Sequence, residues 1–80
     1  MSSNNLKTLG NNIRMIRQIK GVSQEALAVK LNISQAAYSK MENGKIRLTA
    51  ERFEMILREL SVCDKTVRDF DLNEIFKGNN

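Results

Sequence analysis

Several residue types that build functional sites are scarce in this chain. Its 80 residues include no histidine, tryptophan or proline, and Cys63 is the only cysteine. Without histidine, Cys63 has no evident base partner that would make it a nucleophile, and no cluster of metal-ligating side chains is present. A glycine-rich phosphate-binding loop is also missing. We therefore expect neither an enzyme nor a protein that holds a metal or a cofactor.

Long apolar runs are absent as well. No stretch approaches the roughly 20 residues that span a bilayer. The N-terminal MSSNNLKTLG lacks the basic start and apolar core of a secretory signal. A single cysteine forms no disulfide within the chain, so we expect a reduced thiol in the cytoplasm. The sequence thus predicts a cytoplasmic protein without a membrane partner or a small-molecule substrate.

The composition suits one helical domain. Hydrophobic residues make up 41% and charged residues 28% of the chain, which is typical of a folded globular domain. Eighty residues are close to the lower size at which a single apolar core suffices. The lack of proline and the few runs of β-branched residues favour an all-α fold.

The positive charge is concentrated in the first 50 residues. That part carries eight Lys and Arg against two Glu, a net charge of +6. Residues 51–80 carry five basic and seven acidic residues, a net charge of −2. A basic front half fits binding to a polyanion, although many basic domains bind no nucleic acid.

The first predicted helix covers residues 6–20 and ends at Gly21. The preceding residues 1–5 are small and polar, and we expect a disordered N-terminal arm there. The helix is predicted from apolar side chains that recur at the spacing of one helical face, namely Leu6, Leu9, Ile13 and Ile16.

Two shorter helices joined by a tight turn are predicted next. Ser23 and Ser34 are good N-caps, and Asn32 between them tolerates the left-handed conformation that a sharp turn needs. The second of these helices covers residues 35–42, where an Asn-Gly pair stops it. Ala28 is small at the point where the two helices would cross closest. The apolar residues expected beneath the turn are Leu27, Leu31, Ile33, Tyr38 and Met41.

The C-terminal third is less regular. A helix capped by a threonine is predicted at residues 50–61. Beyond it two interpretations remain open: Asp64 caps a helix that runs through Phe70, or residues 62–70 form an irregular connection. A short last helix is predicted near residues 72–77.

Five short motifs follow one another between residues 9 and 45: LGNNIRMIR, SQEALA, LNIS, QAAYSKME and ENGK. In this order and spacing they resemble the lambda-repressor-like domain of the Cro/C1-type (XRE) family of bacterial and phage regulators. The resemblance extends over residues 9–60. It implies a compact bundle of four to five helices, with a helix-turn-helix at its second and third helices. The implied DNA-binding domain covers residues 6–61, and residues 62–80 form a C-terminal segment that is a candidate dimerisation element.

The resemblance implies that the third helix reads bases. Gln35 begins this helix, and glutamine can pair with adenine through two hydrogen bonds in the major groove. Ala36 matches a second groove-facing position and could contact a thymine methyl group. Ser39 and Lys40 lie on the same face one turn further on, where Lys40 could reach guanine or a phosphate. Tyr38 matches a buried family position, so we expect it in the core rather than stacked on a base.

A second set of residues is implied to bind phosphates. Gln24 matches a family glutamine that contacts the DNA backbone, and the amides of a helix N-terminus suit a phosphate oxygen. The loop after the third helix matches one whose backbone amides and lysine hold phosphates. Arg17 and Glu42 match a family ion pair that ties the first helix to the end of the third. The complete phosphate set is Gln24, Asn43, Gly44, Lys45 and Arg47.

These roles predict a sequence-specific regulator of transcription, expected to be a repressor, that binds double-stranded DNA. We expect a homodimer, because two copies place their recognition helices in successive major grooves. Candidate dimer contacts are Phe70, Leu72, Ile75 and Phe76, which could equally cover the core of one chain. The alternative function is a protein-interaction module of the same fold, such as the antitoxin or antirepressor of a two-protein system.

Overall fold

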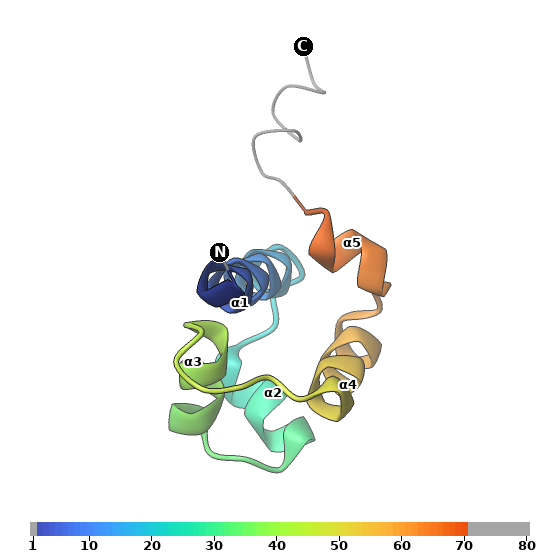
Figure 1. Ribbon diagram of the computed structural model, residues 1–80. Coiled ribbons are helices and arrows are strands. Elements are labelled where there is room, and N and C mark those ends of the chain that lie inside the picture. The colour runs from blue at the N-terminus through green and yellow to red at the C-terminus, as the bar shows by residue number, and fades with distance from the viewer. Residues whose placement is uncertain (1, 71–80) are drawn as a thin grey trace.

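The predicted all-α fold is confirmed. The computed structural model describes residues 2–70, with side chains from Thr8 onward, and these residues form five helices and no strand (Figure 1). The helices are α1 (Ser2–Ile19), α2 (Gln24–Leu31), α3 (Gln35–Glu42), α4 (Ala50–Leu60) and α5 (Asp64–Arg68).

Side-chain caps set the starts of α2, α3 and α4. The hydroxyl oxygens of Ser23, Ser34 and Thr49 each accept a hydrogen bond from the backbone N–H three residues further on, at 3.0–3.2 Å. Such a bond satisfies one of the amides that a helix N-terminus leaves without an intrahelical acceptor. All three helices therefore begin where the sequence predicts.

The first four helices end in one repeated motif. After each helix a residue has a positive φ: Gly21 (73°), Asn32 (61°), Gly44 (71°) and Ser61 (56°). The N–H of that residue bonds to the carbonyl three residues earlier, and the next N–H bonds to the carbonyl five residues earlier. These bonds satisfy carbonyls that the helix end would otherwise leave unpaired. The glycines and Asn32 were predicted to end their helices, whereas Ser61 was predicted to lie within one.

At the N-terminus, α1 begins at Ser2. The prediction of a disordered arm at residues 1–5 is therefore wrong for residues 2–5, which are helical. Adding residues to an existing helix costs much less than nucleating a new one, so a polar end can extend an amphipathic segment.

Of the two interpretations of residues 62–70, the structure supports a helix, but a shorter one than predicted. α5 is preceded by Cys63, whose side chain makes no capping bond. Asp64 is the first helical residue rather than the cap, and its carboxylate accepts a hydrogen bond from Arg68 one turn on. The helix predicted at residues 72–77 lies outside the described residues.

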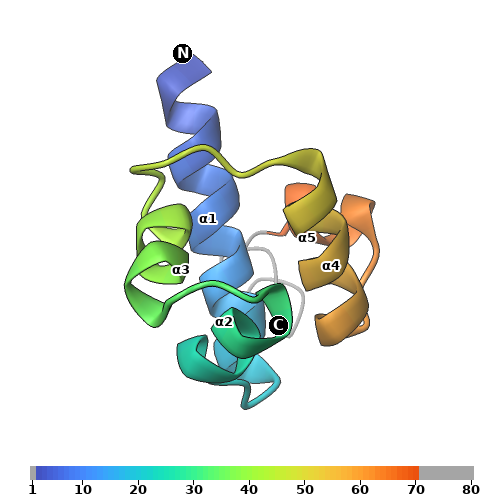
Figure 2. The ribbon, with the colours of Figure 1, turned by 90° about the horizontal axis from the view of Figure 1, so that it is seen from below.

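Helix α1 lies between α3 on one side and α4 and α5 on the other (Figure 2). Its contact with α3 is close, because a Cβ atom added to Gly10 would lie 2.2 Å from the carbonyl oxygen of Glu42. On the side of α5, the buried Asn12 donates a hydrogen bond from Nδ2 to the carbonyl oxygen of Val67, at 2.9 Å. The buried apolar core comprises Ile13, Ile16, Leu27, Ala28, Leu31, Tyr38, Met41, Phe53, Ile56, Leu60 and Val67.

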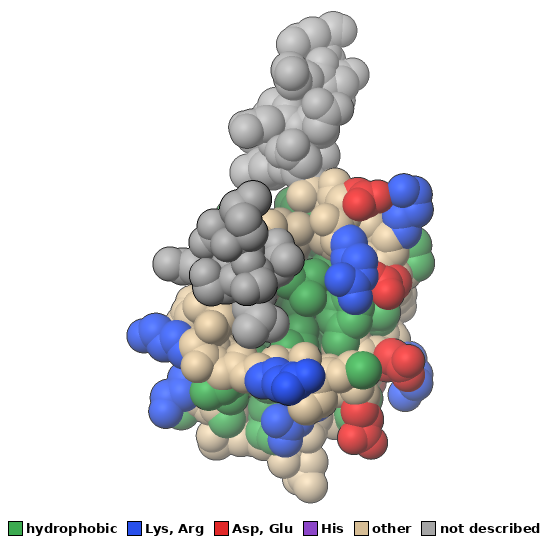
Figure 3. All heavy atoms as spheres, in the orientation of Figure 1, with side chains coloured by type: hydrophobic (Ala, Val, Ile, Leu, Met, Phe, Trp, Pro, Cys, Tyr) green, Lys and Arg blue, Asp and Glu red, His purple; other side chains and the backbone are tan. Residues whose placement is uncertain are grey.

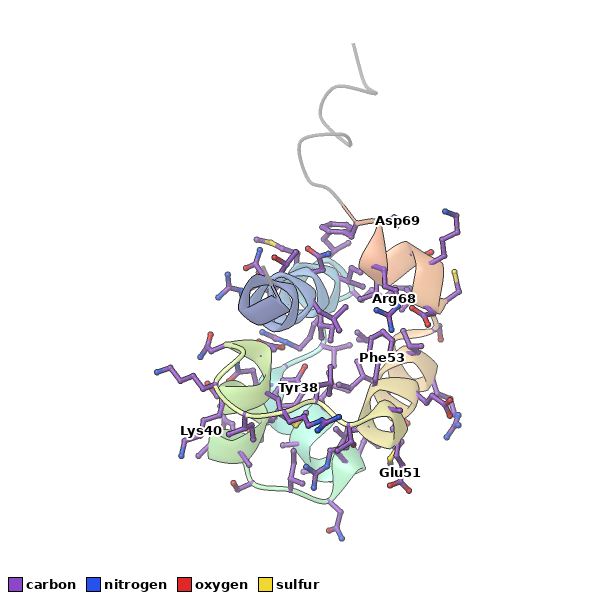
Figure 4. All side chains as sticks on the ribbon, in the orientation of Figure 1. Tyr38, Lys40, Glu51, Phe53, Arg68 and Asp69 are labelled. Carbon is purple, nitrogen blue, oxygen red and sulfur yellow. The ribbon has the colours of Figure 1, made fainter. Side chains whose placement is uncertain are left out.

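Tyr38 lies in this core, as predicted. Its side chain points into the interior (Figure 4), and the residue has no exposed surface. The hydroxyl has no hydrogen-bond partner among the described residues. Burial, and then the nearby Glu42 carboxylate, raise the pKa of Tyr38 well above its ordinary value. The phenol therefore stays protonated in the folded chain.

We expect Tyr38→Phe to be at least as stable as the original chain at neutral pH. Removing a buried hydroxyl without a partner avoids a desolvation cost of about 1 kcal/mol. In the unfolded chain Tyr38 titrates near its ordinary pKa of about 10, so the original chain should lose stability as pH rises above that value. Urea unfolding at pH 7 and pH 11 tests this, and a variant that loses as much stability as the original chain would contradict it.

Candidate nucleic-acid interface

The helix-turn-helix forms as predicted. α2 and α3 are joined by three residues, and they lie together at the lower side of the molecule in Figure 1. Ala28 is 2% exposed, so only a small side chain fits at its position. In the turn between the two helices, Asn32 adopts the left-handed conformation that the sequence predicts. This turn fixes the direction of α3 relative to the rest of the domain.

The outer face of α3 carries the predicted base-reading residues. Gln35, Ala36 and Lys40 are exposed, and Ser39 is half-buried. Lys40 extends away from the body of the molecule, opposite to Tyr38 (Figure 4). The structure therefore brings these four side chains together on one accessible helix face.

The loop after α3 differs from its predicted role in one respect. The backbone N–H groups of Asn43, Gly44 and Lys45 donate to the carbonyls of Ser39, Met41 and Lys40. Because these amides close the end of α3, they are not free to hold phosphates, and the prediction is corrected on this point. Gly44 supplies the turn, and the side chains of the other predicted phosphate residues of this loop, Asn43, Lys45 and Arg47, are exposed.

The predicted ion pair between Arg17 and Glu42 is present and buried. Arg17 Nε lies 2.6 Å from Glu42 Oε2, and Nη2 lies 3.3 Å from Oε1. The two side chains are 8% and 1% exposed. Arg17 Nη1 also donates to the carbonyl oxygen of Val22 at 2.8 Å, which ties the turn before α2 to the pair.

Gln24 also forms a hydrogen bond with this ion pair, a contact that the sequence does not predict. Its Nε2 donates a hydrogen bond to Glu42 Oε1 at 3.0 Å, and the side chain is half-buried. Gln24 is the first residue of α2, and Glu42 is the last residue of α3. We call Arg17, Glu42 and Gln24 the buried polar cluster. It connects α1, α2 and α3 at a single carboxylate.

Charge is distributed unevenly over the surface. In the view of Figure 3, the Asp and Glu side chains lie on the side of α4 and α5. The charged side chains seen on the side of α3 are all Lys and Arg. On the acidic side, Arg68 lies 5.2 Å from the centre of the Phe53 ring, and Figure 4 shows the two facing each other. None of the helices in the described part of the chain is long and apolar enough to cross a membrane.

The candidate dimer contacts are only partly within the described residues. Phe70 is half-buried and packs against the core, so part of its surface is used within one chain. Leu72, Ile75 and Phe76 lie outside the described residues.

Sequence and structure comparisons agree on the family. The helix-turn-helix family profile matches residues 13–63. None of the curated proteins matches this sequence. Among solved structures, the clp gene regulator ClgR from C. glutamicum is 26% identical with a TM-score of 0.72, over 78% of this chain and 80% of that chain.

A second solved structure resembles nearly the whole chain. It is a mutant of the restriction-modification controller protein C.Esp1396I, 33% identical with a TM-score of 0.75, and the match covers 91% of this chain and 97% of that chain. The family match spans both helices of the helix-turn-helix and the loop after them. This chain therefore belongs to the Cro/C1-type (XRE) helix-turn-helix family of DNA-binding domains.

Proposed function

We propose that this protein is a sequence-specific regulator of transcription, acting as a repressor, that inserts α3 into the major groove of double-stranded DNA. The observation that carries the proposal is the outer face of α3, where Gln35, Ala36 and Lys40 are exposed next to the half-buried Ser39. Both structural relatives are regulatory proteins by name. The basic surface beside α3 supports attraction to DNA phosphates.

In this proposal the base readers are surrounded by phosphate contacts. Gln24 lies at the N-terminus of α2, and the exposed residues Asn43, Lys45 and Arg47 follow the C-terminal end of α3. The first backbone N–H groups of α2 and α3 have no intrahelical acceptor, so both helix starts favour an anion. Contacts of this kind set the register of the protein on the duplex but carry no sequence information.

Gln35→Ala should reduce the preference for the cognate site over random DNA. A glutamine that pairs with adenine through two hydrogen bonds contributes roughly 1–3 kcal/mol of discrimination. Selection of bound sequences from random duplexes first identifies the cognate site, and competition binding then measures the preference. Equal losses of affinity for cognate and random duplexes would argue against base reading by Gln35.

Lys45→Ala should weaken binding to all duplexes alike. Loss of one phosphate contact should also flatten the dependence of log affinity on log salt by about one unit. Titrations at several salt concentrations measure this slope. Glu59→Ala on the exposed surface of α4 is the matched control, because it should not flatten the slope. An unchanged slope in Lys45→Ala would remove Lys45 from the phosphate set.

We further propose that the protein binds as a homodimer. A single α3 offers four short or flexible reading side chains, and two of these positions are only alanine and serine. Two copies would double the contacts and read half-sites roughly 34 Å apart. The selected sequences should then be palindromic with that spacing. A non-palindromic product together with a monomer in analytical ultracentrifugation on DNA would contradict the dimer.

A further inference from the structure

We propose that Glu42 is a positioning residue for DNA binding, because its carboxylate orients the side chain of Gln24 toward a phosphate. This inference rests on the proposed function and adds a role that the ion pair alone does not have. Its basis is the hydrogen bond from Gln24 Nε2 to Glu42 Oε1, at 3.0 Å.

The chemistry of the two groups determines which way the amide faces. A carboxylate only accepts hydrogen bonds, so the nitrogen of Gln24 and not its oxygen must face Glu42. One hydrogen of Nε2 is then used by Glu42, and the second points away from the carboxylate. That second N–H is a donor suited to a phosphate oxygen, whereas an amide turned the other way would present its oxygen.

Charge does not oppose this arrangement. An isolated carboxylate beneath a phosphate contact would repel the DNA backbone. Here Arg17 contacts both oxygens of Glu42, at 2.6 and 3.3 Å, so the pair is close to neutral. The carboxylate is also 1% exposed, which keeps water from competing for Gln24.

The same carboxylate connects two separate parts of the phosphate set. Glu42 directly precedes Asn43, whose N–H, with that of Lys45, closes the end of α3. Its side chain holds Gln24, which lies 18 residues earlier at the start of α2. Glu42 therefore keeps the two parts at a fixed separation before DNA arrives. Contacts fixed in advance lose less conformational entropy on binding.

The test compares Gln24→Ala, Glu42→Asp and the double variant on a duplex of random sequence. Glu42→Asp keeps the charge opposite Arg17 but withdraws the carboxylate by one methylene from Gln24. Fluorescence anisotropy at low salt should show affinities about five- to tenfold weaker for each single variant. The double variant should be no more than about twofold weaker than either, since both changes remove the same contact. Circular dichroism at the assay temperature verifies that each variant is folded.

Three outcomes would overturn the proposal. If the two losses multiply in the double variant, Glu42 acts independently of Gln24. If Glu42→Asp binds as tightly as the original chain, positioning is unnecessary. If the original chain binds no duplex at all, the proposed function falls and the positioning role falls with it. Glu59→Asp, at an exposed position on α4, is the control and should leave binding unchanged.

A measurement on the original chain covers the case in which Glu42→Asp does not fold. Side-chain ¹⁵N relaxation by NMR reports how ordered each glutamine amide is. Gln24 should be clearly more ordered than Gln18, which is exposed on α1. Equal mobility of the two amides would overturn the proposal without any use of DNA.

Discussion

Gly10→Ala is expected to destabilise the fold by about 3 kcal/mol or more, near the upper end of the effects of adding an atom to a packed interior. The added Cβ would lie 2.2 Å from the carbonyl oxygen and 2.8 Å from the carbonyl carbon of Glu42. Both atoms belong to the backbone of α3, so no side-chain rotation relieves the clash, and α1 and α3 must separate. Better helix propensity of alanine recovers at most about 1 kcal/mol. Thermal unfolding should show a midpoint more than 10 °C lower, with about 4–8 °C for each kcal/mol.

Gly21→Ala is the matched control for this result. An alanine at position 21 would be strained for a different reason, because the backbone φ there is 73°. The added Cβ itself would meet no atom within 4 Å. Its cost should be limited to that of the left-handed conformation, about 1–2 kcal/mol. A loss in Gly10→Ala no larger than that in Gly21→Ala would mean that α1 and α3 separate at little cost, so that their close approach does not require glycine at position 10.

Arg17→Met is expected to cost about 3–5 kcal/mol, because it leaves a buried carboxylate without its counter-charge. Glu42 would retain only the hydrogen bond from Gln24, and the carbonyl of Val22 would also lose its donor. Such a loss is a large part of the 5–15 kcal/mol that stabilises an ordinary domain. Urea unfolding at neutral pH measures it directly.

A double variant, Arg17→Met with Glu42→Met, separates the cost of an unpaired charge from the value of the pair. Two apolar side chains of similar size need no desolvation of charge, so the double variant should recover much of the loss. If it is as unstable as Arg17→Met alone, the lost hydrogen bonds of Arg17, and not the unpaired charge of Glu42, account for the effect. By the proposed positioning role, the double variant should still bind DNA more weakly than the original chain.

Features with a local chemical signal were predictable from the sequence. Ser23, Ser34 and Thr49 begin their helices through bonds to residues only three positions away. Gly21 and Asn32 end theirs because few other residues adopt a positive φ at low cost. These signals, with the apolar spacing, were enough to predict α2 and α3 and the outward face of α3. Their match to a family motif identified Arg17 and Glu42 as partners.

Features that depend on contacts distant in sequence were not predictable. Ser61 ends α4 in a left-handed conformation that nothing in its residue type signals. From the sequence, Gly10 is only a residue with poor helix propensity inside a helix. The close contact with the backbone of α3 explains why glycine occupies this position. The hydrogen bond between Gln24 and Glu42 links residues whose types suit many other arrangements. The functional roles of the base and phosphate residues remain predictions, to be decided by binding to DNA.

The central place of α1 has a consequence for synthesis in the cell. This helix is made first, but the groups that hold it come later: Glu42 at the end of α3, and Val67 in α5, whose carbonyl oxygen accepts from Asn12. The ribosome adds about 5–20 residues per second, so several seconds pass between the synthesis of α1 and that of these partners. During that interval part of the native surface that covers its apolar face, with Ile13 and Ile16, is still missing. We therefore expect the nascent chain to be most open to chaperones and proteases until α5 has left the ribosome.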